Sequence, residues 1–279
     1  MTTTLPQRRL PLVIPVAIGF AWLLALLAEV GGWAEGLHHD ALLVGSRSLG
    51  TTLLLFLIAW QAMIVAMMLP SSLPMIRIFR VISVRQFAEA RPGSAAYAGP
   101  GPRMLMTAFL GGYVLVWSCF GALAFAGDLA LHRAVAQAPW LPEHPWLITA
   151  SILAFAGAFQ FSSLKDRCLS KCRAPSLYLA SHYARGLDGA FRLGRGHGLF
   201  CLGCCWALML VMFAAGTGNL WWMAALTALM VYEKTGRHGA RAVPVAGVLL
   251  LALAVLALLH PSWLPEILGG SAGAGAHQH

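Results

Sequence analysis

Sulfur-bearing side chains are concentrated in one short stretch of this chain, between Cys201 and Met212. An α-helix brings residues three or four positions apart onto one face. The residues that such a helix would place in line are Cys201, Cys205, Met209 and Met212, with Cys204 one turn from the first. Thiolates and thioethers favour Cu(I), and thiolates also bind zinc and iron-sulfur clusters. Each of these side chains alone would suit an apolar core, but their grouping favours metal binding.

The composition that surrounds this stretch is typical of an integral membrane protein. Hydrophobic residues make up 59% of the 279 residues, charged residues make up 10%, and the mean hydropathy is +0.73. A soluble domain carries about 25% charged residues. The formal net charge is +9, but the basic residues fall in alternate segments between apolar runs, which indicates membrane topology rather than a nucleic-acid surface. We therefore expect a lipid bilayer, and no nucleic acid, around the chain.

The apolar runs predict an all-α, polytopic transmembrane helix bundle of about seven spans that forms a single domain, 1–279. The runs cover about residues 10–28, 49–69, 104–127, 146–164, 199–215, 220–232 and 243–259. The second is expected to stop at Pro70, because proline lacks an N–H donor and its ring clashes with the preceding turn. The sixth is shorter than the roughly 20 residues that a span needs. The alternative is therefore six spans plus a re-entrant hairpin at Leu199–Tyr232 that turns at Gly216.

The distribution of Lys and Arg predicts the orientation in the cytoplasmic membrane. Basic residues are frequent at the N-terminus, in 70–103, in 165–197 and in 233–241, and they are almost absent from the other connections. The positive-inside rule then gives a cytoplasmic N-terminus and a periplasmic or external C-terminus. It makes 70–103 and 165–197 basic cytoplasmic loops, with an interfacial amphipathic helix over Met75–Phe87. The small-residue tail 269–279 is expected to be flexible.

This topology gathers further sulfur atoms at the same membrane face. Cys168 and Cys172 follow the fourth span, three methionines close the second span, and only Cys119 lies elsewhere. Cytoplasmic thiols are normally reduced, so a disulfide framework is disfavoured, and the basic residues around Cys168 and Cys172 favour thiolate. The predicted metal ligands are Cys201, Cys204, Cys205, Cys168, Cys172, Met63, Met67, Met68, Met209 and Met212.

Other polar residues carry weaker signals. Glu233 and Lys234 are expected to reach to the membrane edge rather than to form an internal ion pair or a proton relay. His197, four residues before Cys201, has an imidazole that suits copper or zinc. The chain has no Walker loop, GxSxG elbow, dinucleotide fingerprint or CxxCH haem motif. We therefore predict no catalytic residue, and the chain is not expected to drive transport with ATP by itself.

Three ordered motifs, with Asn219 and the pair Glu233-Lys234, carry a resemblance to a known family. The motifs are Met63–Met75, Leu164–Pro175 and Gly198–Met209. Together they resemble a bacterial family of unknown function described as predicted metal-binding integral membrane proteins, over about Leu49–Arg241. The resemblance implies a protein of the bacterial inner membrane that handles metal. The family has Met before the Asn, where this chain has Gly218, so that position is not counted as a ligand.

The principal hypothesis is a metal-binding integral membrane protein that handles copper as Cu(I), in its transport, delivery or homeostasis. Zinc and iron are the alternative metals, and the expected partner is a cytoplasmic or periplasmic metal-delivery protein. One alternative function is a membrane thiol oxidoreductase that cycles Cys204 or Cys205 against Cys168 or Cys172, although these thiols face a reducing compartment. The other is a non-catalytic subunit of a membrane assembly that holds a partner through the basic loops.

Overall fold

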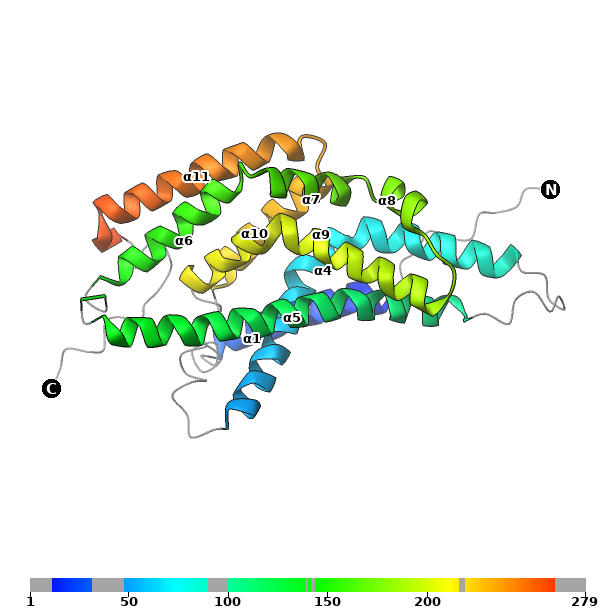
Figure 1. The fold of residues 1–279 in the computed structure, drawn as a ribbon, viewed down its shortest axis with the longest axis horizontal. Coiled ribbons are helices and arrows are strands. Elements are labelled where there is room, and N and C mark those ends of the chain that lie inside the picture. The colour runs from blue at the N-terminus through cyan, green and yellow to red at the C-terminus, as the bar shows by residue number, and fades with distance from the viewer. Residues whose placement is uncertain are drawn as a thin grey trace.

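The structure is a computed structural model of the chain, and it describes residues 12–31, 48–89, 100–138, 140–141, 144–215 and 219–263. Within these ranges the regular structure is helical throughout (Figure 1). The helices are α1 (Val13–Val30), α4 (Leu49–Glu89), α5 (Pro102–Gln137), α6 (Pro145–Phe159), α7 (Ser163–Arg173), α8 (Pro175–His182), α9 (Gly186–Ala215), α10 (Leu220–Thr235) and α11 (Gly239–Leu259), followed by a 3-10 turn, Pro261–Trp263. The tail 269–279 and the position of the expected turn at Gly216 lie outside the described residues.

Five of these helices, α1, α4, α5, α9 and α11, are long and apolar enough to cross a membrane. A sixth crossing is available if α6 and α7, which meet at a bend of 62°, form one broken span. The predicted all-α polytopic bundle is thus confirmed, with about six spans. The predicted sixth span corresponds to α10. This helix has 16 residues, fewer than the roughly 20 that a crossing needs.

The expectation that the second span stops at Pro70 is wrong. Helix α4 passes through Pro70 and Pro74 without interruption and is 41 residues long in total. A proline at this position leaves the carbonyl four residues earlier without its helical donor. Trp22 Nε1 of α1 donates to that carbonyl, Ala66 O, at 3.0 Å. The hydroxyls of Ser71 and Ser72 donate to Met68 O at 2.8 and 3.2 Å. The Trp22 indole therefore replaces the donor that Pro70 lacks, the two hydroxyls add bonds to the nearby Met68 O, and the helix persists.

The basic segments are largely helical rather than loop-like. The second half of α4 packs against α5 and α8, in a core cluster that includes Phe79, Phe109 and Leu179. The Phe79 and Phe109 rings stack with their centroids 4.7 Å apart. The expected interfacial helix over Met75–Phe87 is thus part of the second half of α4. Its Met75, Ile76 and Phe79 are buried in this cluster, whereas Phe87 is exposed. Residues 165–197 form α7, α8 and the first turns of α9; their cytoplasmic location stays a prediction.

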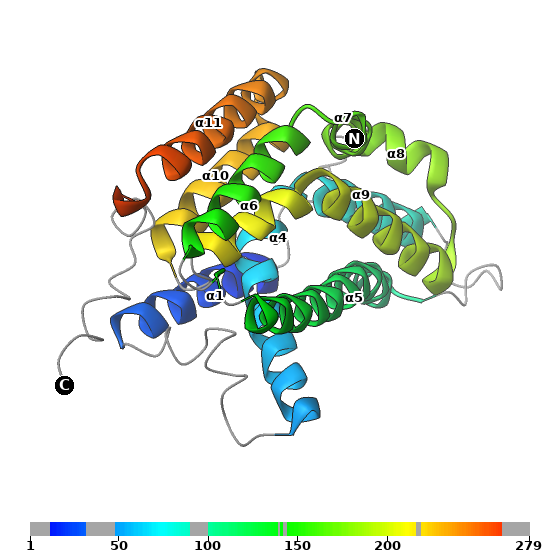
Figure 2. The same cartoon turned by 60° about the vertical axis from the view of Figure 1, so that its left-hand side comes forward.

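Two close helix pairs frame the centre of the bundle. Helices α5 and α9 run side by side, and α6 lies against α11 (Figures 1 and 2). A Cβ atom on Gly194 of α9 would lie 1.9 Å from Phe109 O of α5, so this pair needs a residue without a side chain, as is common at membrane helix interfaces. Helix α10 contacts α4, α7, α9 and α11. The sulfur-bearing part of α9 is therefore surrounded by helices from both halves of the chain.

Candidate metal centre

All ten predicted ligands belong to one hydrophobic cluster in the middle of the bundle. The three cysteines of α9 and four methionines are at most 1% exposed, whereas Cys168, Cys172 and Met63 are partly buried and pack against them. The fully buried methionines are Met67, Met68, Met209 and Met212. The sixth cysteine, Cys119, is exposed on α5. Helix packing thus brings together residues that are spread over about half of the sequence.

The cysteines of α9 are oriented by their own helix backbone. The thiols of Cys204 and Cys205 both donate to Cys201 O, at 3.1 and 2.7 Å. Such local bonds to a preceding carbonyl hold a short polar side chain in one rotamer. The thiols of Cys204 and Cys205 are therefore both held close to the backbone at Cys201.

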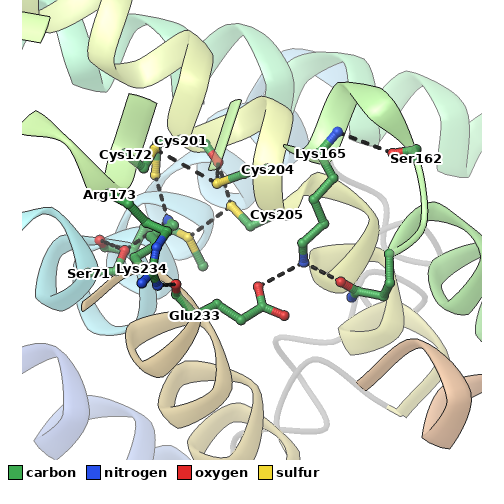
Figure 3. Close-up of polar contacts among 12 residues, drawn as sticks. Ser71, Ser162, Lys165, Cys172, Arg173, Cys201, Cys204, Cys205, Glu233 and Lys234 are labelled. Carbon is green, nitrogen blue, oxygen red and sulfur yellow. Dashed lines mark hydrogen bonds and ion pairs between the residues drawn. The ribbon is translucent and has the colours of Figure 1, made fainter. Parts of the chain in front are cut away.

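Two contacts join these thiols to sulfur atoms of other helices. Cys204 Sγ lies 4.0 Å from Cys172 Sγ of α7 (Figure 3), and Cys205 Sγ lies 3.4 Å from Met68 Sδ of α4. The first distance is far longer than the S–S bond of about 2.05 Å in a disulfide. Two metal–sulfur bonds of about 2.3 Å reach at most roughly 4.6 Å between sulfurs. The Cys172 and Cys204 sulfurs are thus close enough to share one metal ion.

Gly203 makes room for the other cysteine of α7, Cys168. A Cβ atom on Gly203 would lie 2.5 Å from Cys168 Sγ, a separation that non-bonded atoms do not adopt. The Cys168 thiol therefore lies directly against the α9 backbone at Gly203.

Lys234 of α10 turns inward to this cluster, contrary to the expectation that it reaches to the membrane edge. Its side chain is buried, and Nζ lies 3.2 Å from Cys201 Sγ and 3.0 Å from Ser71 Oγ (Figure 3). Tyr113 OH of α5 also contacts Cys201 Sγ, at 3.4 Å. An ammonium group and a phenol thus lie against the same thiol.

Glu233, the neighbour of Lys234, pairs with α7 instead. Its Oε2 accepts from Lys165 Nζ at 2.8 Å, and Lys165 also donates to Gln160. Lys165 is 0% exposed and Glu233 is 2% exposed. At the other end of α7, Arg173 donates to Glu233 O and, at 3.1 Å, to Gly236 O, where a cation is favourable at a helix C-terminus. Lys165 and Arg173 thus fasten both ends of α7 to α10, which holds Cys172 opposite Cys204.

His197 lies one helical turn before Cys201 but does not contact its sulfur directly. Its ring stacks between Phe109 and Tyr113, with centroids 6.1 and 5.6 Å away, and its Nε2 is buried without a hydrogen bond. Tyr113 therefore contacts both the His197 ring and the Cys201 thiol. Among the described residues, no three His, Cys, Asp or Glu side chains form a group that could hold a metal ion.

Sequence reasoning missed Lys165, Gln160, Ser71 and Tyr113. Lys165 follows an apolar run directly, where a lysine usually reaches to the membrane surface. The signal for a buried position was the presence of an acidic residue, Glu233, at the end of another apolar run, with which it could pair. Ser71 in a helix is expected to donate to a carbonyl of the preceding turn, as it does to Met68 O, but its contact with Lys234 depends on α10. Tyr113 offered no signal, because nothing in the α5 sequence distinguishes it from other core aromatics.

The long apolar helices and the buried thiols and thioethers between them define the class of the protein. It is a multi-pass, all-helical membrane protein with soft candidate ligands in its core. Comparison with known families makes this specific: the chain belongs to the PpoB2 family of copper chaperones, whose model matches residues 57–257. The matched region contains all ten predicted ligands and Lys234, but not α1. No curated protein and no solved structure matches the chain. The expectation of a family that handles metal is confirmed, and copper is the metal that the matched family implies.

Proposed function

We propose that this protein is a membrane-embedded chaperone that holds Cu(I) on the thiols of α7 and α9 and passes the ion to a partner protein. The observation that carries the proposal is the 4.0 Å separation of Cys172 Sγ and Cys204 Sγ, in a chain of the copper chaperone family. Two thiols from different helices at this distance can share one ion. Copper is the cargo of this site rather than a resident cofactor.

The donor set supports Cu(I) over the other metals considered. Thiolates and thioethers are soft ligands that select Cu(I), and the cluster that surrounds Cys204 offers thiols and thioethers in a largely apolar setting. Zinc sites are almost always closed by four N, S or O ligands, whereas the described residues contain no group of three His, Cys, Asp or Glu. A pair of thiols with a nearby thioether suits Cu(I), which is stable with few sulfur ligands.

The burial of the sulfur atoms supports a direction of movement within the protein. Cys168 and Cys172 on α7 are partly exposed, the cysteines of α9 are fully buried, and Met68 on α4 lies beyond Cys205. We take Cys201, Cys204 and Cys205 as the primary ligands, of which two hold the ion at one time, and Cys168 and Cys172 as the thiols that exchange copper with the outside. The thioether path would consist of Met63, Met67, Met68, Met209 and Met212.

The exposed face of α7 suits a protein partner that delivers or accepts copper. Arg167 and Lys171 are exposed on the same short helix as the two partly exposed thiols. Positive charges beside an exchange site attract a partner with an acidic surface and orient it before contact. We therefore place the partner at α7, and the long apolar helices of the bundle in the lipid bilayer.

The test is a copper-content measurement on detergent-purified protein that has been loaded with Cu(I) under reducing, oxygen-free conditions. Cys204→Ser and the pair Cys201→Ala with Cys205→Ala should each lose most of the bound copper. Cys119→Ser is the matched control, because it removes an exposed thiol on α5 and should retain the wild-type copper content. Unchanged copper in the Cys204 and Cys201/Cys205 variants would refute the assignment of the site.

A further inference from the structure

We propose that Lys234 is the specificity-determining residue of this site: a built-in cation that admits a monovalent metal ion and excludes divalent ones. The inference rests on the proposed function, since it concerns the choice of ion at the same thiols. It goes beyond that function because it names the feature that separates Cu(I) from Zn²⁺ and Cu²⁺.

The position of the ammonium group is set by α4 and α9. Lys234 Nζ lies 3.2 Å from Cys201 Sγ and 3.0 Å from Ser71 Oγ. The Ser71 hydroxyl donates its proton to Met68 O at 2.8 Å, so its oxygen is free to accept from the ammonium. Ser71 therefore aims Lys234 at the thiol, and the side chain is only 5% exposed.

The other cations near the cluster, one buried and one partly buried, already have partners. Lys165 Nζ is paired with Glu233 Oε2 at 2.8 Å, and Arg173 donates to the carbonyl oxygens at the C-terminus of α10. Within the described part of the chain, no carboxylate lies at ion-pair distance from Lys234. Its charge is thus directed to the thiols, which bind metal as thiolates.

A count of charges gives the preference for a monovalent ion. The proposed site binds the ion with two thiolates at a time, of which Cys201 beside Lys234 is one. Two thiolates carry two negative charges and Lys234 balances one of them, so a single positive charge completes a neutral site. A divalent ion would leave one positive charge in excess. An uncompensated charge in a buried site is strongly disfavoured, because no water is present to solvate it. The ammonium also repels a divalent ion twice as strongly as a monovalent one.

The experiment loads detergent-purified wild-type protein, Lys234→Met and Lys234→Gln with equimolar Cu(I) and Zn²⁺ under oxygen-free conditions, and measures the ratio of copper to zinc retained. Arg241→Gln is the control, because it removes a positive charge from an exposed position in the first turn of α11, away from the thiols. Wild-type protein and the control should retain copper with little zinc. Both neutral variants should gain zinc, so that the ratio falls by about tenfold or more, as expected when an interaction of a full charge is lost at a site shielded from water.

Each other outcome decides the question. If both neutral variants keep the wild-type ratio while they hold copper, Lys234 has no role in selectivity, and the proposed function stands. If they lose both metals in equal proportion, Lys234 has a structural role only, and the inference is overturned. A wild-type ratio near one also overturns it. If wild-type protein retains no copper, the proposed function fails together with this inference.

Discussion

Cys172 of α7 and Cys204 of α9 lie 32 positions apart in the chain, yet their sulfur atoms are 4.0 Å apart. This approach depends on α7, which is fastened to α10 by Lys165 at its start and by Arg173 at its end. It also depends on Gly203, whose missing side chain leaves space for Cys168. The thiol pair is thus a product of three helices, and each support can be tested separately.

Removing the buried ion pair should loosen the site. Glu233→Gln leaves Lys165 buried without a counter-charge, and breaking a buried pair in this way typically costs about 3–5 kcal/mol. We expect a clear fall in the thermal unfolding temperature in detergent, together with lower copper retention, because α7 would no longer hold Cys172 in place. The control is Asp188→Asn, which breaks the exposed Asp188–Arg192 pair and should change neither quantity. Wild-type stability in Glu233→Gln would show that the pair does not hold α7.

Filling the space at Gly203 should expel Cys168. Alanine is favoured over glycine in a helix interior by about 1 kcal/mol, so Gly203→Ala should fold. Its Cβ atom would, however, collide with Cys168 Sγ, and the thiol must rotate away. We expect faster alkylation of Cys168 by a maleimide, measured by mass spectrometry. Gly111→Ala is the control, because a Cβ atom there meets no other atom within 4 Å; equal alkylation rates in the two variants would contradict the close contact.

The thiol pair should respond to copper rather than act as a redox couple. The sulfur atoms would have to approach by about 2 Å to form a disulfide, and on the predicted cytoplasmic side thiols would be kept reduced. Thiol trapping in intact cells should find Cys172 and Cys204 reduced, and Cu(I) loading of the purified protein should protect both from alkylation. A reversible Cys172–Cys204 bond that persists in cells treated with a copper chelator would instead support the thiol oxidoreductase alternative.

Replacing the thioether next to Cys205 should affect copper more than stability. Met68→Leu nearly conserves volume, and such exchanges usually cost less than about 1.5 kcal/mol. The sulfur that lies 3.4 Å from Cys205 Sγ would be lost, so copper retained against a competing chelator should fall several-fold. Met104→Leu, at a methionine that is 54% exposed on α5, serves as the control. If Met68→Leu holds copper as tightly as wild type, Met68 only packs the core.

Much of the fold could be predicted from the sequence, because the bilayer imposes simple rules on a chain. Backbone polar groups in lipid must bond within the chain, so long apolar runs predict helices, and α4, α5, α9 and α11 all follow from that rule. The helical period likewise placed Cys201 and Cys205 on one face. The end of the second span could not be predicted, because the donor that satisfies Ala66 O comes from Trp22 of another helix.

The contacts that make the candidate site were decided by tertiary structure alone. Sequence periodicity describes one helix at a time, whereas the meeting of Cys172 with Cys204, or of Cys205 with Met68, depends on how helices pack against one another. The same holds for α10, where Lys234 turns to the thiols and Glu233 turns to Lys165. The sequence by itself determined a membrane bundle rich in soft ligands; helix packing decided which ligands meet and which cation lies beside them, because burial forces charged groups to find partners.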